Sequence, residues 1–187
     1  MKKEFLINLL KKYDSGYLAE QFFKQQMLDL LSISDNCFER SCRVGHFTAS
    51  SWLLNSAGTK ALLMHHAKLD RWLQLGGHCD GDADVLKVAI KEAQEESGII
   101  SIKPVSEEIF DLDVHLIPTI KQEAPHYHFD IRFLLQQVNS EEPLVLNRES
   151  KSLEWFSPNK NTLPTNDISI IRMLEKWNKL MGCEKKS

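Results

Sequence analysis

Three glutamates, Glu92, Glu95 and Glu96, lie close together near the end of one predicted helix. Steps of three and four residues place Glu92 on the same helix face as the other two, with neighbouring Cβ atoms about 5–6 Å apart. These like charges repel one another, and acidic side chains are unfavourable near the C-terminal end of a helix. A divalent cation such as Mg²⁺ would offset this cost, because it binds carboxylate oxygens together with substrate phosphates. The alternative is the solvated acidic face of a surface helix.

A loop with three glycines and three aspartates, residues 76–84, precedes these glutamates. Its leading glycines have no Cβ, so the Gly76 carbonyl can approach a cation that the glutamates bind. Asp82 or Asp84 can cap the helix, because a carboxylate accepts hydrogen bonds from the free N–H groups of the first turn. We therefore predict a loop and then a helix over residues 84–97, with oxygen ligands from both parts.

This segment resembles the Nudix box, whose pattern is G-x5-E-x7-R-E-U-x-E-E-x-G-U, where U is an aliphatic residue. The match runs from Gly77 to Ile99 and retains the three glutamates and the glycine that ends the helix. A pattern with so many fixed positions is far more specific than a lone short glycine motif. Two positions depart from it: Ala83 stands at the first Glu and Lys91 at the Arg. A neighbouring aspartate can take the first role if the loop shifts by one residue.

The resemblance implies a Nudix fold of the α/β class (α+β type), in which a mixed β-sheet is sandwiched between α-helices. It also implies a pyrophosphohydrolase that uses Mg²⁺ or Mn²⁺ and cleaves a nucleoside diphosphate derivative or nucleoside triphosphate by water attack on phosphorus. The implied metal ligands are Glu92, Glu95, Glu96 and the Gly76 carbonyl. Glu92, Glu95 and Glu149 are the implied catalytic residues, since a carboxylate near the metal can take a proton from the attacking water.

Glu149 is included because it lies in the loop before a strand that contains Trp155, where some Nudix enzymes place a further glutamate. Glu154 competes for this role, and a plain surface glutamate is the alternative.

The segment HYHFDIR alternates polar and apolar residues, as a strand with one polar face does. We predict that His126, His128 and Arg132 from this polar row bind substrate, together with His78 from the glycine loop. Structural contacts within the row are the alternative. Two histidines at i and i+2 can also bind zinc, but no third ligand of the usual type is evident in the sequence.

Hydrophobic periodicity predicts the elements that must position these residues. Helices are expected over residues 3–13, 17–32, 84–97 and 166–181. Strands are expected over residues 44–55, 60–66, 72–75, 114–120, 126–138, around Val145 and 153–157. A turn signal between the first two strands indicates a β-hairpin. Helices and strands interleave, which is typical of a mixed α/β domain.

The chain has 187 residues, enough for one compact domain with a small extension. We predict an N-terminal helical extension over residues 1–40 and a Nudix hydrolase domain over residues 41–187. The extension can pack on the sheet, act as a lid over the substrate, or form the surface of a homodimer.

Composition restricts the partners and the location of the chain. A net charge of −3 gives no bulk attraction to nucleic acid or to an anionic membrane. No apolar run approaches the roughly 20 residues that span a bilayer. The four cysteines form no CxxC pair, and the start lacks the pattern of a secretory signal, so we expect a cytoplasmic protein with reduced thiols. The expected partner is a small nucleotide-type substrate.

Two other functions are alternatives to hydrolysis. The departures Ala83 and Lys91 favour a Nudix-like module that binds a nucleotide with little or no cleavage, whereas the three retained glutamates argue against it. An isoprenoid diphosphate isomerase is known within the same fold, but it needs a catalytic cysteine, and Cys79 alone does not establish that chemistry.

Overall fold

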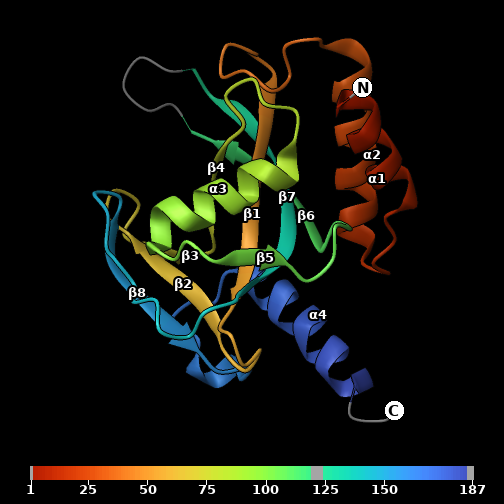
Figure 1. Cartoon of the computed structure of the whole chain (residues 1–187). Coiled ribbons are helices and arrows are strands. Elements are labelled where there is room, and N and C mark those ends of the chain that lie inside the picture. The colour runs from red at the N-terminus through yellow and green to blue at the C-terminus, as the bar shows by residue number, and fades with distance from the viewer. Residues whose placement is uncertain (1, 119–123, 185–187) are drawn as a thin grey trace.

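The computed structural model describes residues 2–118 and 124–184 of the chain. Four α-helices and a short 3-10 helix surround one eight-stranded sheet (Figure 1). The helices are α1 (Lys2–Lys12), α2 (Leu18–Ile33), α3 (Val85–Ser97), α4 (Ile168–Glu184) and the 3-10 helix η1 (Lys160–Thr162). The strands are β1 (Gly45–Leu54), β2 (Ala61–His66), β3 (Arg71–Leu73), β4 (Leu75–His78), β5 (Ile102–Pro104), β6 (Asp111–Ile117), β7 (His126–Gln137) and β8 (Ser150–Phe156).

The centre of the sheet is the parallel pair β1 and β7, which runs from Gly45 opposite Tyr127 to Leu54 opposite Gln136. At one end of this pair, β4 lies beside β1 and β6 lies beside β7, both antiparallel. At the other end, β2 pairs with β1 and β5 pairs with β7. The sheet thus brings β6, β7, β1 and β4 side by side, although they are distant in sequence.

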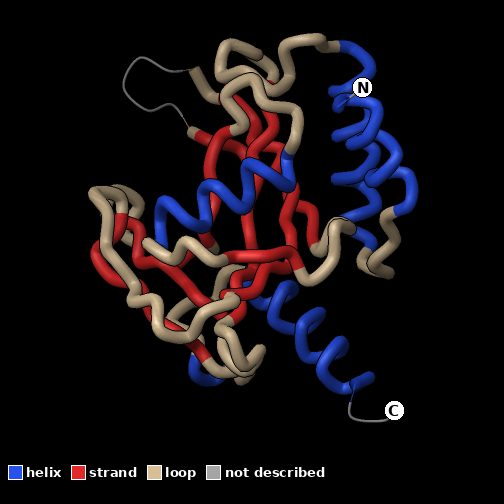
Figure 2. Tube along the Cα trace, viewed as in Figure 1, coloured by secondary structure: helices blue, strands red, loops and turns tan. Residues whose placement is uncertain are grey.

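The two faces of the sheet are buried against different helices (Figure 2). Side chains alternate between faces along a strand, so β1 places Phe47 and Ala49 on one side and Trp52 on the other. The first side packs on α3 and on the N-terminal helices, whose Leu10 and Met27 are fully buried there. The second packs on α4.

Most of the predicted elements are confirmed to within about three residues, and the fold is the expected mixed sheet with flanking helices. The strand predicted around Val145 is wrong: its N–H donates to the Ser97 carbonyl at the end of α3, so this segment caps a helix and does not pair in the sheet. The strand predicted over residues 72–75 is divided at Gln74 into β3 and β4, which pair with different strands.

Two further details differ from the expected elements. The three-residue strand β5 was not predicted, because its short Ile-Lys-Pro sequence gives little strand signal. The predicted strand over residues 114–120 begins earlier, at Asp111, and its residues 119 and 120 lie outside the described residues. Within the described part of the chain, no helix has the length and apolar character needed to cross a membrane.

Candidate active site

Helix α3 is fixed at both ends by side-chain and backbone features that the sequence indicates. Asp84 is the N-cap, and its Oδ1 accepts a hydrogen bond from the Lys87 N–H at 3.2 Å. Gly98 ends the helix in the left-handed conformation, with φ of 77°, which glycine adopts at little cost. The apolar face of α3 is buried through Val85, Val88, Ala89 and Ala93. This packing fixes where the glutamates on the adjoining face can point.

The acidic face of α3 meets the glycine strand β4. The Gly76 N–H donates to Glu96 Oε2 at 2.8 Å. The Glu92 carboxylate lies directly over Gly77, where any Cβ would collide with it, and a Cβ at Gly76 would collide with Ser50 of β1. Gly77 is therefore required for the Glu92 carboxylate to approach the strand backbone, and Gly76 is required for β4 to lie this close to β1.

The electrostatics of this contact favour a bound cation. Glu96 is 5% exposed, and burial raises its pKa to about 8. The Gly76 N–H opposes this shift, and the charges of Glu92 and Glu149 add to it. Burial also raises the pKa of Glu92, against the effect of Lys91. Two desolvated carboxylates beside a backbone strand form a set of hard oxygen donors, which fits Mg²⁺ or Mn²⁺.

Lys91 contacts two of the three glutamates. Its Nζ lies 3.1 Å from Glu92 Oε1 and 3.2 Å from Glu95 Oε2. The Glu95 side chain is 57% exposed, so it lies at the edge of the site and Glu92 lies deeper. The lysine thus bridges two carboxylates.

Asp82 and Asp84, the candidates for the role of the missing first glutamate, both make other contacts in the structure. Asp82 pairs with Lys87 at 2.8 Å, and Asp84 is occupied in capping α3. Ala83 packs against the apolar core. Whether either aspartate takes the role of the first glutamate stays a prediction.

Glu149 lies in the turn before β8, close to the end of α3. Its N–H donates to Asn147 Oδ1 at 2.9 Å, and the Asn147 side-chain amide donates to the Glu95 carbonyl at 3.3 Å. The charge of Glu149 contributes to the raised pKa of Glu96. Glu154 lies further along, within β8 and opposite Leu63 of β2. The structure thus brings Glu149 towards the box glutamates; its catalytic role stays a prediction.

A group of histidines lies next to the glycine strand, at the end of the sheet where β1 and β7 begin. Its members are His46, His78, His115, His126 and His128. The sheet register places His46 of β1 beside His128 of β7, with His115 of β6 on the other side of His128. The His78 ring is 5.1 Å from that of His46 and 4.8 Å from that of His128. The His126 ring is 5.0 Å from that of His46.

The sequence identified only part of this group. It singled out His78, His126 and His128, but it missed His46 and His115. Polar residues at alternate positions of β1 were the available signal for His46, but the neighbouring strand cannot be inferred from one strand alone. The substrate contacts predicted for the three histidines remain predictions.

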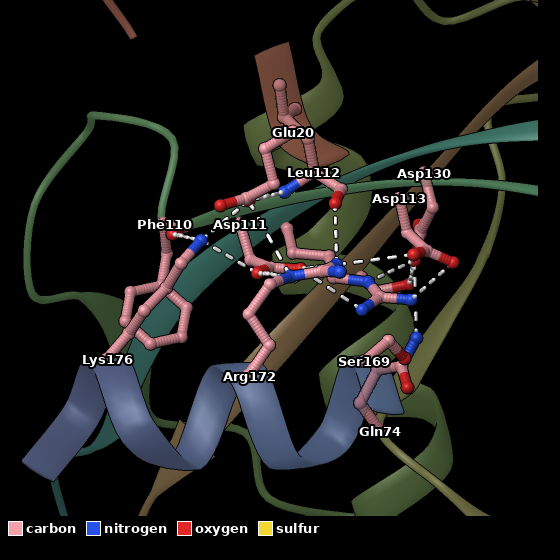
Figure 3. Close-up of polar contacts among 12 residues, drawn as sticks. Glu20, Gln74, Phe110, Asp111, Leu112, Asp113, Asp130, Ser169, Arg172 and Lys176 are labelled. Carbon is pink, nitrogen blue, oxygen red and sulfur yellow. Dashed lines mark hydrogen bonds and ion pairs between the residues drawn. The ribbon is translucent and has the colours of Figure 1, made fainter. Parts of the chain in front are cut away.

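Arg132 is buried and is not part of this histidine group. It is 2% exposed, and its guanidinium donates to Asp130 at 2.7 Å and to Asp111 at 3.1 Å. Arg172 and Lys176 reach from α4 to the same Asp111, and Lys176 also pairs with Glu20 of α2 at 2.6 Å (Figure 3). This location does not present Arg132 to a substrate, which corrects the expected contact: paired carboxylates hold it inside the sheet layer.

A cavity of about 280 Å³ adjoins the N-terminal half of α3. It is lined by His78, Cys79, Asp80, Asp82, Lys87, Val88 and Lys91. Cys79 is 4% exposed, and burial together with nearby aspartates raises the pKa of its thiol. A buried, protonated thiol is a poor nucleophile, so the cavity offers polar contacts but no activated cysteine.

Comparison with known proteins agrees with this geometry. The family model described as NUDIX domain matches residues 45–177. Among solved structures, a C. elegans Ap4A hydrolase in a binary complex has a TM-score of 0.57 at 18% identity, covering 73% of this chain and 97% of that one. A NUDIX family hydrolase from Clostridium perfringens has a TM-score of 0.51 at 24% identity, covering 72% and 97%. None of the curated proteins matches.

A third structure extends the similarity to more of the chain. A UDP-X diphosphatase has a TM-score of 0.53 at 15% identity, covering 95% of this chain and 92% of that one. Because about nine residues are left uncovered, the overlap includes most of the N-terminal helices. At these identities the similarity concerns the fold.

Proposed function

The chain belongs to the Nudix family of hydrolases, and we propose that it cleaves a diphosphate linkage in a nucleoside diphosphate derivative with the help of Mg²⁺ or Mn²⁺. One observation supports this above all: the buried Glu96 accepts a hydrogen bond from the Gly76 N–H, and Glu92 packs on Gly77. These carboxylates and the Gly76 carbonyl would hold the cation, with Glu95 completing the set from the edge. A divalent cation bound there neutralises the charge that develops on the phosphoryl oxygens.

The chain's own residues would position the nucleophile and the phosphates. Lys91 contacts both Glu92 and Glu95, which restricts their rotamers before any ligand binds. Glu149 is exposed in a turn tied to the end of α3, and we propose that it accepts the proton of the attacking water. Glu95 and Glu92 are the alternatives for this base.

The substrate is proposed to be polar on both sides of the diphosphate. His78, His126 and His128 lie on or beside the glycine strand, at the end of the sheet where β7 begins. There they can donate hydrogen bonds to hydroxyl or anionic groups of a substrate. The UDP-X diphosphatase that overlaps 95% of this chain favours a nucleoside diphosphate linked to a second group. A nucleoside triphosphate is the second candidate.

The structure weakens one alternative function and leaves another to experiment. An isomerase would need a reactive cysteine, and Cys79 is buried with a raised pKa. A module that only binds nucleotide would share the same glutamates, so only turnover separates it from a hydrolase. A cytoplasmic location and the absence of nucleic-acid or membrane partners stay predictions from composition, and homodimer formation stays an open prediction.

A substrate panel tests this proposal. Nucleoside diphosphate sugars, dinucleoside polyphosphates, nucleoside triphosphates and an acyl coenzyme A would be incubated with the full chain, with and without Mg²⁺. We expect Mg²⁺-dependent formation of a nucleoside monophosphate, fastest with a nucleoside diphosphate sugar. Nucleotide binding that is equally tight without metal and gives no product would identify a binding module and overturn the proposal. Preference for the acyl coenzyme A would overturn the proposed substrate class.

A further inference from the structure

The histidine group includes three imidazoles that converge on one point. The potential ligand atoms of His46, His78 and His128 all lie within 4.8 Å of one another. They come from three neighbouring strands, β1, β4 and β7, so the sheet register itself holds them together. A rigid origin of this kind distinguishes the group from histidines that meet by chance on flexible loops.

The deepest of these side chains has no hydrogen-bond partner. His46 is 2% exposed, and neither of its ring nitrogens bonds to any described residue. His128 Nε2 is likewise buried without a partner among the described residues. A buried polar atom that forms no hydrogen bond destabilises the folded state, so side chains of this kind are expected to have a ligand.

We propose that His46, His78 and His128 bind a divalent transition-metal ion such as Zn²⁺, at a site separate from the carboxylate site of α3. Imidazole nitrogen is a preferred ligand of Zn²⁺ but a poor one for Mg²⁺, which selects oxygen. The two sites therefore differ in donor chemistry and can be filled by different metals at once. Three protein ligands leave the fourth tetrahedral position for water or for an oxygen of a bound substrate.

The distances fit a site that closes on its metal. Zinc lies about 2.0–2.1 Å from histidine nitrogens, so tetrahedral ligands are about 3.3 Å apart. The observed limit of 4.8 Å requires ring movements of about an ångström.

Two further histidines flank the three proposed ligands. His126 Nδ1 lies 3.0 Å from the Ala124 carbonyl, an arrangement that fixes the proton on Nδ1 and leaves Nε2 as an acceptor. Its ring stacks on that of His46 at 5.0 Å, so His126 lies beside the three ligands. His115 Nδ1 lies 3.0 Å from Asp113 Oδ2, and its ring is 5.5 Å from that of His128.

Zinc titration of the full chain tests the proposal without any reference to catalysis. The protein is first stripped with a chelator, and Zn²⁺ is then added in the presence of excess Mg²⁺ against a competing chromophoric chelator. We expect one tightly bound Zn²⁺ per chain, with at least tenfold weaker binding in His78→Gln and in His128→Gln. The control is His65→Gln, since His65 lies in β2 outside the group, and its zinc binding should be unchanged. Substituted Co²⁺ should show the intense visible bands of a tetrahedral site.

A second set of variants separates this site from the carboxylates. Glu92→Gln should keep its zinc, and zinc should raise the thermal unfolding midpoint of the wild-type and Glu92→Gln proteins but not that of His78→Gln. Circular dichroism of the zinc-free variants checks folding; because His46 is buried, the partly exposed His78 is the deciding position. Absence of bound zinc, or zinc that Glu92→Gln removes and His78→Gln retains, would overturn the inference.

The outcomes also separate this inference from the proposed function. Histidine-dependent zinc binding by a chain that hydrolyses nothing would support the metal site and contradict the diphosphate hydrolase. Mg²⁺-dependent hydrolysis by a chain that binds no zinc would do the reverse.

Discussion

At the scale of single residues, the departure at Lys91 is compensated by geometry. Its Nζ lies close to both Glu92 and Glu95, so one point charge holds two carboxylates. An arginine fork could make the same contacts with more donors. We predict that Lys91→Arg preserves or raises kcat/KM, whereas Lys91→Met lowers it by roughly tenfold, or about 1.4 kcal/mol of transition-state stabilisation. Steady-state kinetics measure both; a large loss in Lys91→Arg would mean that the loop geometry is adapted to lysine.

The buried Glu96 predicts how stability depends on pH in the metal-free protein. Burial raises its pKa to about 8 from an ordinary value of 4.5. A raised pKa means that the folded state favours the protonated form of Glu96. Its contribution to the free energy of unfolding is therefore complete below about pH 4.5 and is lost as the pH rises through about 8. Glu96→Gln should remove this loss, and its unfolding midpoint should fall less between pH 5 and 8 than that of the wild type. Equal slopes in thermal denaturation would contradict the burial argument.

At the scale of elements, α4 and α2 are joined through buried charges. Lys176 Nζ lies 2.6 Å from Glu20 and 2.7 Å from Asp111, and all three side chains are buried. Replacing one partner leaves the others uncompensated, which costs about 3–5 kcal/mol. We predict that Lys176→Met lowers the free energy of unfolding, measured in urea, by this amount. Lys179→Met, on the exposed side of the same helix, is the control and should change stability by about 0.5 kcal/mol. Similar values for both variants would contradict the proposed role of the network.

Local patterns predicted the elements better than their pairing. The period of α3, its Asp84 cap and the Gly98 stop are all encoded within fifteen neighbouring positions, so the helix and its acidic face were predictable. The histidine group was not, because a strand's alternation shows which face a side chain occupies but not which strand lies beside it. His46 and His128 meet only through the parallel pairing of β1 and β7. Arg132 was misplaced for a related reason: Asp130 is its neighbour along the same strand, but Asp111 meets it only through the pairing of β6 with β7.

At the scale of the whole molecule, the N-terminal helices are packed into the core that also contains α3. Leu6, Leu10 and Met27 are fully buried there, and each contributes about 1.5–3 kcal/mol through burial. Removing the proposed extension, residues 1–40, should therefore abolish cooperative unfolding of the remaining chain. Calorimetry of the fragment 41–187 measures this. A fragment that unfolds cooperatively near the wild-type temperature would show that the extension is an independent addition.

The carboxylates of α3 and the glycine strand are proposed to hold the cation that supports diphosphate cleavage. The most direct test is Mg²⁺-dependent hydrolysis of a nucleoside diphosphate sugar by the wild type, Glu92→Gln and Glu96→Gln, with Mg²⁺ binding measured on the same samples. We predict that both variants lose at least a hundredfold in rate relative to the wild type and bind Mg²⁺ more weakly. Both should remain folded, because each substitution removes a desolvated charge. Turnover near the wild-type rate in both variants would contradict the account.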